Sequence, residues 1–238
     1  MLPAVYFEDL GFQSYRQVWD YQESLLQQNT RLKLTGEAAS TRHHLLLVEH
    51  PPVYTLGKSG KLENLIWSED EIKKREIEFF HINRGGDITF HGPVQIVGYP
   101  ILDLEKMKPD LGWYLRSLEE MIILTLADYG VTGGRSKGET GVWIDAGIPG
   151  KERKICAMGI KCSRWITMHG FAFNVQTDLA YFDGIVPCGI QNKAVTSLQK
   201  ELNSPVSMAE VKERMKKNFE SVFNCRLVDE VKINSVCS

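Results

Sequence analysis

The chain has 238 residues, of which 43% are hydrophobic and 24% charged, close to the averages of globular proteins. Its 28 basic and 30 acidic side chains leave a formal charge of −2, which argues against a protein that grips nucleic acid phosphates. No apolar run approaches the roughly 20 residues of a membrane span, and Glu8 and Asp9 near the start do not fit a secretory signal. We therefore expect a cytoplasmic protein with neither a nucleic-acid nor a membrane partner.

Five cysteines are spread through the chain: Cys156, Cys162, Cys188, Cys225 and Cys237. An odd number of cysteines without a signal peptide is typical of free thiols in a reducing compartment. The Cys-x-x-Cys spacing of a structural zinc site is absent, so the sequence predicts no metal.

The first hundred residues alternate between strand and helix patterns. Short apolar runs rich in β-branched or aromatic residues predict buried strands at Ala4–Glu8, Leu45–Val48 and Gln95–Ile101. Between the first two, apolar residues recur at three- and four-residue steps, which predicts an amphipathic helix from Phe12 to Leu34. Pro93 cannot donate to a sheet, so we expect the third strand to begin after it.

The second half begins with a helix pattern from Leu111 to Tyr129, which Asp110 caps and Gly130 terminates. Strand patterns follow at Gly141–Ile144, Lys154–Lys161 and Ile166–Val175, and a last helix pattern covers Met208–Phe223. Cys162–Trp165 has a length suited to a hairpin between two of these strands. Because strands and helices do not alternate regularly, we expect one α+β domain over residues 1–238, with a mixed or antiparallel sheet flanked by helices.

A glycine-rich segment, RGGDITFHGPVQIVGYPI, runs from Arg84 to Ile101. Gly85 and Gly86 lack Cβ atoms, so the backbone here can turn sharply or approach a ligand closely. Polar groups flank this turn on Arg84, Asp87, Thr89 and His91. The segment predicts a loop that wraps a ligand, although an ordinary glycine turn with a local histidine hydrogen bond explains the same residues. Its spacing fits neither GxGxxG nor GK[ST], which favours neither a dinucleotide nor a phosphate loop.

Lys154 opens the largely apolar stretch KICAMG on a predicted strand. From such a position, a lysine commonly extends its ammonium group to solvent. In a dry pocket, desolvation would instead lower the lysine pKa and provide a base near pH 7. The residues alone are compatible with both interpretations.

Cys188 lies between Pro187, which fixes φ, and Gly189, which permits unusual backbone angles. This context suits a thiol at a tight turn beside a free backbone N–H, as an oxyanion site needs. A free cysteine can equally be a small core residue. Among the five thiols, Cys188 has the local context most favourable to reactivity.

Four separated blocks together resemble the octanoyl-[acyl carrier protein]–protein transferase family, also called lipoyl or octanoyl transferases. They are the glycine-rich segment above, GRSKGETGVWI at Gly134–Ile144, RKICAMGIKCSRWITMHGFAFNV at Arg153–Val175 and DGIVPCGI at Asp183–Ile190, with Thr196–Leu198 just downstream. The resemblance covers roughly residues 45–200. It implies a fold similar to that of biotin and lipoate protein ligases.

The resemblance also implies an activity and its residues. Members move an octanoyl group from the thioester of acyl carrier protein to a lysine of a lipoyl domain, without a cofactor. The family's nucleophile falls on Cys188 and its partner lysine on Lys154. The acyl-binding residues fall on Arg84, Gly85, Gly86, Asp87, Ile88, Thr89, Phe90 and His91, and on Ala157, Met158, Gly159, Gly170, Phe171 and Ala172. The expected acceptors are lipoyl domains of 2-oxoacid dehydrogenase complexes and the glycine cleavage H protein, and we expect a monomer.

Two positions depart from the family pattern. Val94 stands where the family usually has glycine, and we expect it to narrow the pocket floor. Cys156 stands where the family often has a small residue, and it offers a second candidate thiol.

Three other functions fit parts of the sequence. An ATP-dependent lipoate or biotin ligase of the same fold uses a lysine on the corresponding strand, but it needs no cysteine, and the biotin-ligase GRGRxGR pattern is absent. A non-catalytic carrier-binding protein would need neither Lys154 nor Cys188. A hydrolase would pair Cys188 with His91 or His169.

Overall fold

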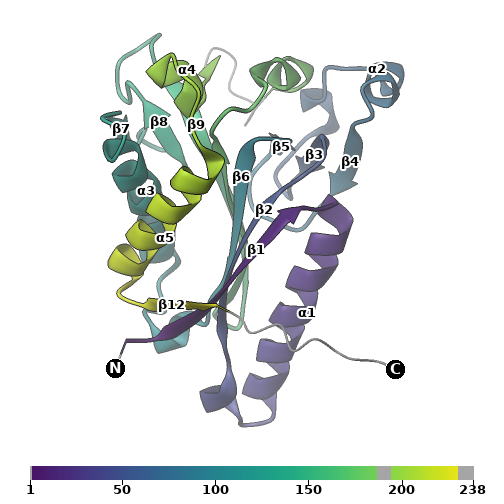
Figure 1. Ribbon diagram of the computed structural model, residues 1–238. Helices are drawn as coiled ribbons and strands as arrows, with labels where there is room; N and C mark the ends of the chain where they lie inside the picture. Colours follow the sequence, from purple (N-terminus) through teal and green to yellow (C-terminus); the bar gives the residue numbers. More distant parts are fainter. Residues whose placement is uncertain (1, 187–193, 230–238) are drawn as a thin grey trace, which may run out of the picture.

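The computed structural model describes residues 2–186 and 194–229, and the structural statements below refer to these residues (Figure 1). The strands are β1 Ala4–Phe12, β2 His43–Glu49, β3 Val53–Leu56, β4 Glu78–His81, β5 Ile88–His91, β6 Gln95–Ile101, β7 Gly133–Gly134, β8 Val142–Ile144, β9 Arg153–Ser163, β10 Ile166–Asn174, β11 Ala194–Val195 and β12 Arg226–Asp229. The α-helices are α1 Tyr15–Leu34, α2 Glu69–Lys74, α3 Leu111–Ala127, α4 Leu198–Leu202 and α5 Met208–Phe223. Short 3₁₀ helices are η1 Ala38–Ser40, η2 Leu62–Asn64, η3 Leu104–Lys106 and η4 Leu179–Gly184.

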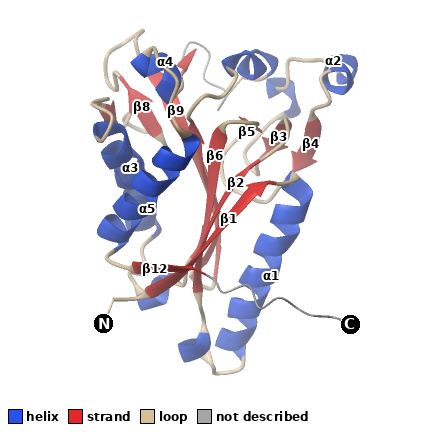
Figure 2. Ribbon diagram, viewed as in Figure 1, coloured by secondary structure: helices blue, strands red, loops and turns tan. Residues whose placement is uncertain are grey.

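A large mixed sheet runs through the centre, in the order β12-β1-β2-β6-β10-β9-β8-β7, with β11 paired to β9. β1 is parallel to β2 and β12, and β11 is parallel to β9, whereas the pairings of β2 with β6 and of successive strands from β6 through β10, β9 and β8 to β7 are antiparallel. Figure 2 shows α1 on one side of this sheet and α3 with α5 on the other. A smaller sheet, β4-β3-β5, lies beside the N-terminal end of α1. The mixed α+β architecture predicted from the sequence is thereby confirmed.

Two apolar clusters hold these layers together. On the α3 and α5 side, Phe171 and Phe173 of β10 pack with Tyr114, Leu118 and Phe219. On the α1 side, apolar residues of α1 pack against the opposite face of the sheet: Val18, Leu25 and Leu26 meet Val97, Tyr99, Met168 and Ala172. No helix within the described ranges combines the length and apolarity that crossing a membrane requires.

The first helix begins later than its periodicity predicts. Phe12 belongs to β1, where it pairs with Glu49 of β2, and the helix starts at Tyr15. Ser14 is the N-cap, and its side chain accepts a hydrogen bond from the Gln17 N–H. The prediction of a helix from Phe12 was wrong because periodicity alone does not register strand pairing across the sheet.

The later elements lie close to their predicted ranges. Asp110 caps α3 by accepting from the Trp113 N–H at 2.9 Å, as predicted. β9 extends beyond its predicted range at both ends and β10 ends one residue earlier than predicted, so only Arg164 and Trp165 lie between them. Both residues have positive φ, which matches the right-handed twist of a tight hairpin. The strands of the small sheet, each of four residues, were not predicted.

Val94 has a left-handed backbone, with φ of +52°. Its N–H donates to the Glu49 carboxylate at 3.0 Å, and its carbonyl accepts from the Gln176 N–H at 3.0 Å, so both backbone groups fix this conformation. A β-branched residue is strained at such a φ, whereas glycine is not. Val94 does not line the cavity described below, so the expectation that it narrows a pocket floor was wrong. The departure from glycine at this position therefore affects the strain of the backbone.

We predict that Val94→Gly is more stable than Val94→Ala. Both variants lose the γ-methyl contacts of valine, but only glycine, which also lacks Cβ, removes the left-handed strain, which costs about 1 kcal/mol. Urea unfolding of the two variants and the parent chain measures this difference. Equal stability of the two variants, or a less stable glycine variant, would show that the backbone at this position is not strained.

Two histidines are buried as neutral groups. Burial lowers the pKa of His43 to about 4, and its Nδ1 accepts the Asp103 N–H at 3.1 Å. Burial likewise lowers the pKa of His50 to about 4. The His50 Nδ1 lies 2.8 Å from the Gln13 carbonyl and its Nε2 lies 2.9 Å from the Tyr99 hydroxyl. A proton on either ring would replace an accepting lone pair and carry charge into the interior.

These lowered pKa values predict a loss of stability in mild acid. The unfolded chain binds protons near pH 6.5 while the folded chain does not, so the free energy of unfolding falls as the pH drops from 6.5 toward 4. Each histidine contributes about 1.4 kcal/mol to this loss between pH 7.5 and 5.5. Urea titrations over this window measure it, because most carboxylates titrate below it. An unchanged midpoint would contradict neutral burial.

Candidate functional site

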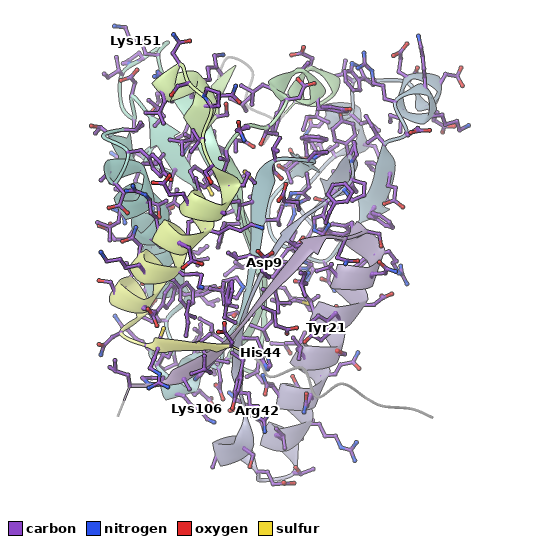
Figure 3. The ribbon with its side chains drawn as sticks, viewed as in Figure 1. Asp9, Tyr21, Arg42, His44, Lys106 and Lys151 are labelled. Carbon is purple, nitrogen blue, oxygen red and sulfur yellow. The ribbon has the colours of Figure 1, made fainter. Side chains whose placement is uncertain are left out.

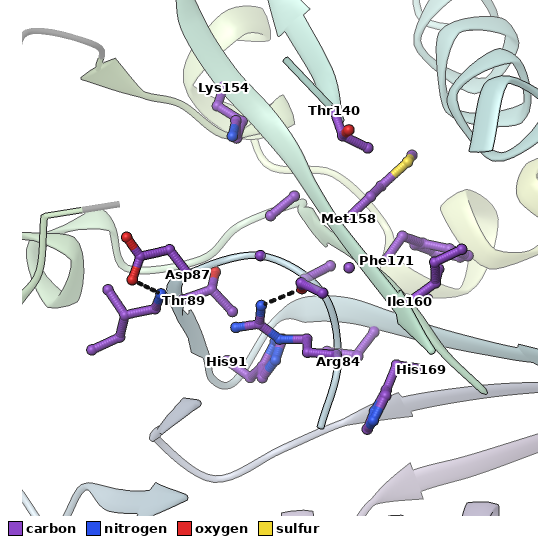
Figure 4. A pocket seen from close by; sticks show the side chains of 18 of the residues that line it. Arg84, Asp87, Thr89, His91, Thr140, Lys154, Met158, Ile160, His169 and Phe171 are labelled. Carbon is purple, nitrogen blue, oxygen red and sulfur yellow. Dashed lines mark hydrogen bonds between the residues drawn. The ribbon is translucent and has the colours of Figure 1, made fainter. Parts of the chain in front are cut away.

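A cavity of about 460 Å³ opens between the 84–91 segment and strands β6, β9 and β10. Every described residue that the sequence assigned to catalysis or acyl binding lines it, except Phe90. In Figure 4, Lys154 and Thr140 lie at one end of the view, and Arg84, His91 and His169 lie at the other. Segments far apart in the sequence therefore converge on one space.

The floor of the cavity is a patch of four small residues. Gly159 pairs with Gly170 and Ala157 pairs with Ala172 across β9 and β10, so the four share one face. A Cβ at Gly159 would lie 2.6 Å from the Gly85 carbonyl oxygen. The Gly85 N–H in turn donates to the Ile160 carbonyl at 2.8 Å. Because Gly159 has no side chain, the glycine-rich segment contacts strand β9 directly, and the small residues leave the cavity open beside this contact.

Three of the expected binding residues have side chains that pack into apolar clusters. Phe171 and its strand partner Met158 pack with the core cluster on the α3 side, as alternation along a strand requires. Phe90 stacks on Tyr181 with ring centroids 4.6 Å apart, inside the cluster of the small sheet. Of the three, Met158 and Phe171 line the cavity and Phe90 does not.

A second loop, residues 57–60, holds the glycine-rich segment in place. The Lys58 N–H donates to the Arg84 carbonyl at 3.0 Å, and the Ser59 N–H donates to the Gly86 carbonyl at 3.2 Å. A Cβ at Gly57 would collide with the Gly86 carbonyl. Ser59 also lines the cavity. The sequence analysis missed this loop, although its paired glycines in LGKSG carried a signal of close packing.

Arg84 is buried, and its side chain attaches the glycine-rich segment to strand β3. Its guanidinium donates to the Thr55 carbonyl at 2.8 Å and to the Thr55 hydroxyl at 3.1 Å. A further bond reaches the Gly85 carbonyl at 3.0 Å (Figure 4). Arg84 therefore joins the small sheet to the cavity wall.

His91 and His169 form a polar end of the cavity. Burial, helped by nearby positive charge, lowers the pKa of His91 well below its usual range and that of His169 to about 3, so both rings are neutral. The His169 Nε2 lies 3.1 Å from the Asn83 Oδ1. Its Nδ1 is buried and has no hydrogen-bond partner within the part of the chain that the structure describes.

The backbone of His169 breaks the alternation of β10. Its φ is +59°, and its N–H donates to the side chain of Gln22 on α1 at 3.1 Å. Counting by twos would place His169 on the face of Phe171, which packs toward α3. The contacts with Asn83 and α1 instead place it on the α1 side of the sheet. Sequence periodicity gave no signal of this left-handed residue.

Lys154 lies at the other end of the cavity, buried rather than extended to solvent. Its Nζ is 4.5 Å from the centroid of the Trp143 ring, a cation–π contact. Its carbonyl accepts from the Thr196 N–H at 3.0 Å, and Lys154 pairs with Val195 of β11. The interpretation in which the ammonium group snorkels into water does not hold.

Cys188 lies outside the described residues, but both flanks of its segment are attached to the cavity walls. The Val186 N–H donates to the Asn64 carbonyl at 2.8 Å, and the Asn64 amide donates to the Asp87 carboxylate. On the other side, Ala194 pairs with Arg153, next to Lys154.

Cys156 does not provide an alternative reactive thiol. Its side chain is fully buried in the core cluster, and burial strongly raises its pKa. A thiol with a raised pKa in an apolar environment is protonated and unreactive. The expectation of a second candidate thiol at this position was therefore wrong.

A chain of buried amides crosses the site. The His91 Nδ1–H donates to the Gln95 Oε1 at 3.1 Å, and the Gln95 amide donates to the Asn174 Oδ1 at 2.8 Å. The Asn174 amide then donates to the Thr196 carbonyl at 3.0 Å. Gln95 and Asn174 line the cavity. Both fall within the sequence blocks quoted above, but nothing in the sequence indicated that they meet.

The loop before β8 closes the Lys154 end. Glu119 of α3 is fully buried, and its carboxylate lies 2.9 Å from Arg135 and accepts the Gly141 N–H at 3.1 Å. Between these anchors, residues 138–140 border the cavity. One buried carboxylate therefore positions this wall.

Comparison with known proteins agrees with the resemblance found in the sequence. Residues 14–220 match the model of the lipoyl protein ligase A/B catalytic domain. The octanoyltransferase of Christiangramia forsetii is 54% identical over 232 residues, covering 95% of this chain and 99% of that protein. The octanoyltransferase of Flavobacterium psychrophilum is 53% identical over 233 residues, covering 96% and 100%.

Solved structures share the fold at low sequence identity. Lipoate-protein ligase A bound with ATP has a TM-score of 0.70 at 14% identity, covering 98% of this chain and 90% of that one. Ta0514 of T. acidophilum, a putative lipoate protein ligase with bound lipoic acid, has a TM-score of 0.67 at 14% identity, covering 98% and 91%. With its small-residue floor, its buried lysine and these relatives, the chain belongs to the lipoyl protein ligase A/B catalytic domain family.

Proposed function

We propose that the protein is an octanoyltransferase that moves an octanoyl group from octanoyl-acyl carrier protein to a lysine of a lipoyl domain, through a thioester on Cys188. The observation that carries this proposal is the buried Lys154 at one end of an apolar-floored cavity. Full-length relatives named octanoyltransferases support the reaction class. Lipoyl domains of 2-oxoacid dehydrogenase complexes and the glycine cleavage H protein are the acceptors to test.

The position of Cys188 in the chain supports its role. Cys188 follows Val186 by two residues, and two residues of chain span at most about 7 Å between Cα atoms. Val186 is tied through Asn64 to Asp87, which lines the cavity. The described chain that leads to Cys188 is thus attached to the acyl-binding loop, which supports the proposed role.

The reaction has two displacements. The Cys188 thiolate attacks the thioester carbonyl carbon, a new C–S bond forms, and the bond to the carrier sulfur breaks with release of the carrier thiolate. The acceptor amine then attacks the acyl-Cys188 carbonyl, forms the amide and expels the Cys188 thiolate. The first exchange is close to balanced in energy, and conversion of a thioester to an amide drives the second. No nucleotide is consumed.

Lys154 has a role in each displacement. As a cation beside Cys188, it favours the thiolate over the thiol. It gives its proton to the departing carrier thiolate, and in the resulting neutral form it accepts the proton that the acceptor amine loses as the amide forms, a contribution of about 10²–10⁴-fold in rate. The contact with the Trp143 ring fixes the direction of the side chain at the cavity.

The cavity suits an unbranched acyl chain. Gly159, Gly170, Ala157 and Ala172 present a flat apolar floor, along which methylene groups can lie. Burial of each methylene contributes about 0.8 kcal/mol, so a chain of eight carbons gains several kcal/mol.

We predict that Cys188→Ala abolishes the acyl adduct. The parent chain should gain the mass of one octanoyl group after incubation with octanoyl-acyl carrier protein, as seen by intact-mass spectrometry without ATP. Cys156→Ala is the matched control and should retain the adduct, because its thiol is buried and protonated. An adduct that survives in Cys188→Ala, or transfer that requires ATP and a free acid, would contradict the thioester mechanism and favour a ligase.

We predict that Lys154→Arg separates the two displacements. Arginine keeps the positive charge beside the thiol but cannot act as a base. Acylation of Cys188 should therefore continue, while transfer to an apo lipoyl domain falls by about 10²–10⁴-fold. Lys154→Met should impair both steps. Rapid-quench mass spectrometry follows the two half-reactions, and undiminished transfer by the arginine variant would exclude Lys154 as the base.

A further inference from the structure

Asn174 occupies a functional position that the reaction above leaves unassigned. On β10, Gly170 and Ala172 form part of the cavity floor, and Asn174 is the next residue on the same face. It follows the Phe173–Cys156 pair, which places it toward the Lys154 end of β9. Asn174 is only 4% exposed, so it brings a polar primary amide to a buried wall of the cavity.

Its hydrogen bonds fix which way the amide points. The Gln95 amide nitrogen donates to the Phe90 carbonyl at 3.2 Å and to the Asn174 Oδ1 at 2.8 Å. The Asn174 oxygen is therefore the acceptor, and its Nδ2 is the donor. Nδ2 donates to the Thr196 carbonyl at 3.0 Å. A primary amide carries two hydrogens, and this bond uses one of them.

The same contacts hold the amide close to the reacting groups. The Thr196 N–H donates to the Lys154 carbonyl at 3.0 Å, so a single residue links Asn174 to Lys154. Thr196 is fully buried, and its side chain is bonded to Glu201. The donor is thus fixed before any substrate arrives. Such fixed donors in a water-poor site stabilise developing negative charge efficiently.

We infer that the second N–H of Asn174 Nδ2 is an oxyanion donor for the thioester carbonyl. This role rests on the proposed acyl transfer. When Cys188 attacks, the carbonyl π electrons move onto the oxygen, and the Asn174 N–H donates a hydrogen bond to that oxyanion. When the intermediate collapses, the C=O bond re-forms and the carrier thiolate leaves. Asn174 neither gains nor loses a proton.

The test compares two reactions of the same thiol. Acylation by octanoyl-acyl carrier protein passes through an oxyanion, whereas alkylation by iodoacetamide displaces iodide directly and forms none. Asn174→Ala should therefore acylate Cys188 about 10²–10³-fold more slowly, while its alkylation rate across pH 6–9 stays within about twofold of the parent. Asn174→Ser gives the same test with a hydroxyl that can still bond Thr196 but has one hydrogen only.

Asn29→Ala is the matched control. Asn29 is also a buried amide, but it bonds both the carbonyl and the N–H of Arg42. Arg42 lies at the end of the molecule opposite Lys151, which is three residues before Lys154 (Figure 3). This variant should acylate at the parent rate.

The outcomes separate this role from the proposed function. Parent acylation with equally fast Asn174 variants would overturn the oxyanion role alone. A parallel fall in acylation and alkylation would also overturn it, because Asn174 would then act by placing the thiol. Absence of any acyl-Cys188 on the parent chain would overturn the proposed function and this role with it.

Discussion

The direct contact of the glycine-rich loop with strand β9 is the constraint on which the site depends. The Gly85 N–H bonds the Ile160 carbonyl, and the missing Cβ of Gly159 leaves space for the Gly85 carbonyl. A methyl group at Gly159 would push the loop outward and open the cavity to water. The same lack of side-chain volume provides both the close approach and the binding space.

Around this contact, the cavity has an apolar floor and a polar wall. The floor offers a ligand only apolar surface to bury, since glycine and alanine have no polar side-chain groups. The wall holds polar groups whose hydrogen bonds are largely satisfied in advance, from His91 through Gln95 to Asn174. Buried amides of this kind are rigid because breaking one bond leaves its partner unsatisfied in a medium of low dielectric constant. In the reaction proposed above, this rigidity holds the Asn174 donor in one orientation.

Much of the site follows from sequence pattern, and part of it does not. Lys154 and the small residues of β9 and β10 were identified from quoted motifs, and the structure gathers them around one cavity. The Gln95–Asn174 contact was not, because their 79-residue separation is closed only by the pairing of β6 with β10. Cys156 illustrates the opposite case: as a departure from the family pattern it offered a second candidate thiol, and its burial in the core makes that thiol unreactive.

The sequence by itself determined the periodic features: the amphipathic helices, the hairpin of β9 and β10, and the glycines that permit close approach. These follow from local rules, since a strand alternates its faces and glycine alone lacks a Cβ. Tertiary structure alone decided the face on which His169 lies, the left-handed backbone at Val94 and the partners of each buried amide. Such features depend on hydrogen bonds between distant segments, and no local pattern specifies which segment will supply the partner.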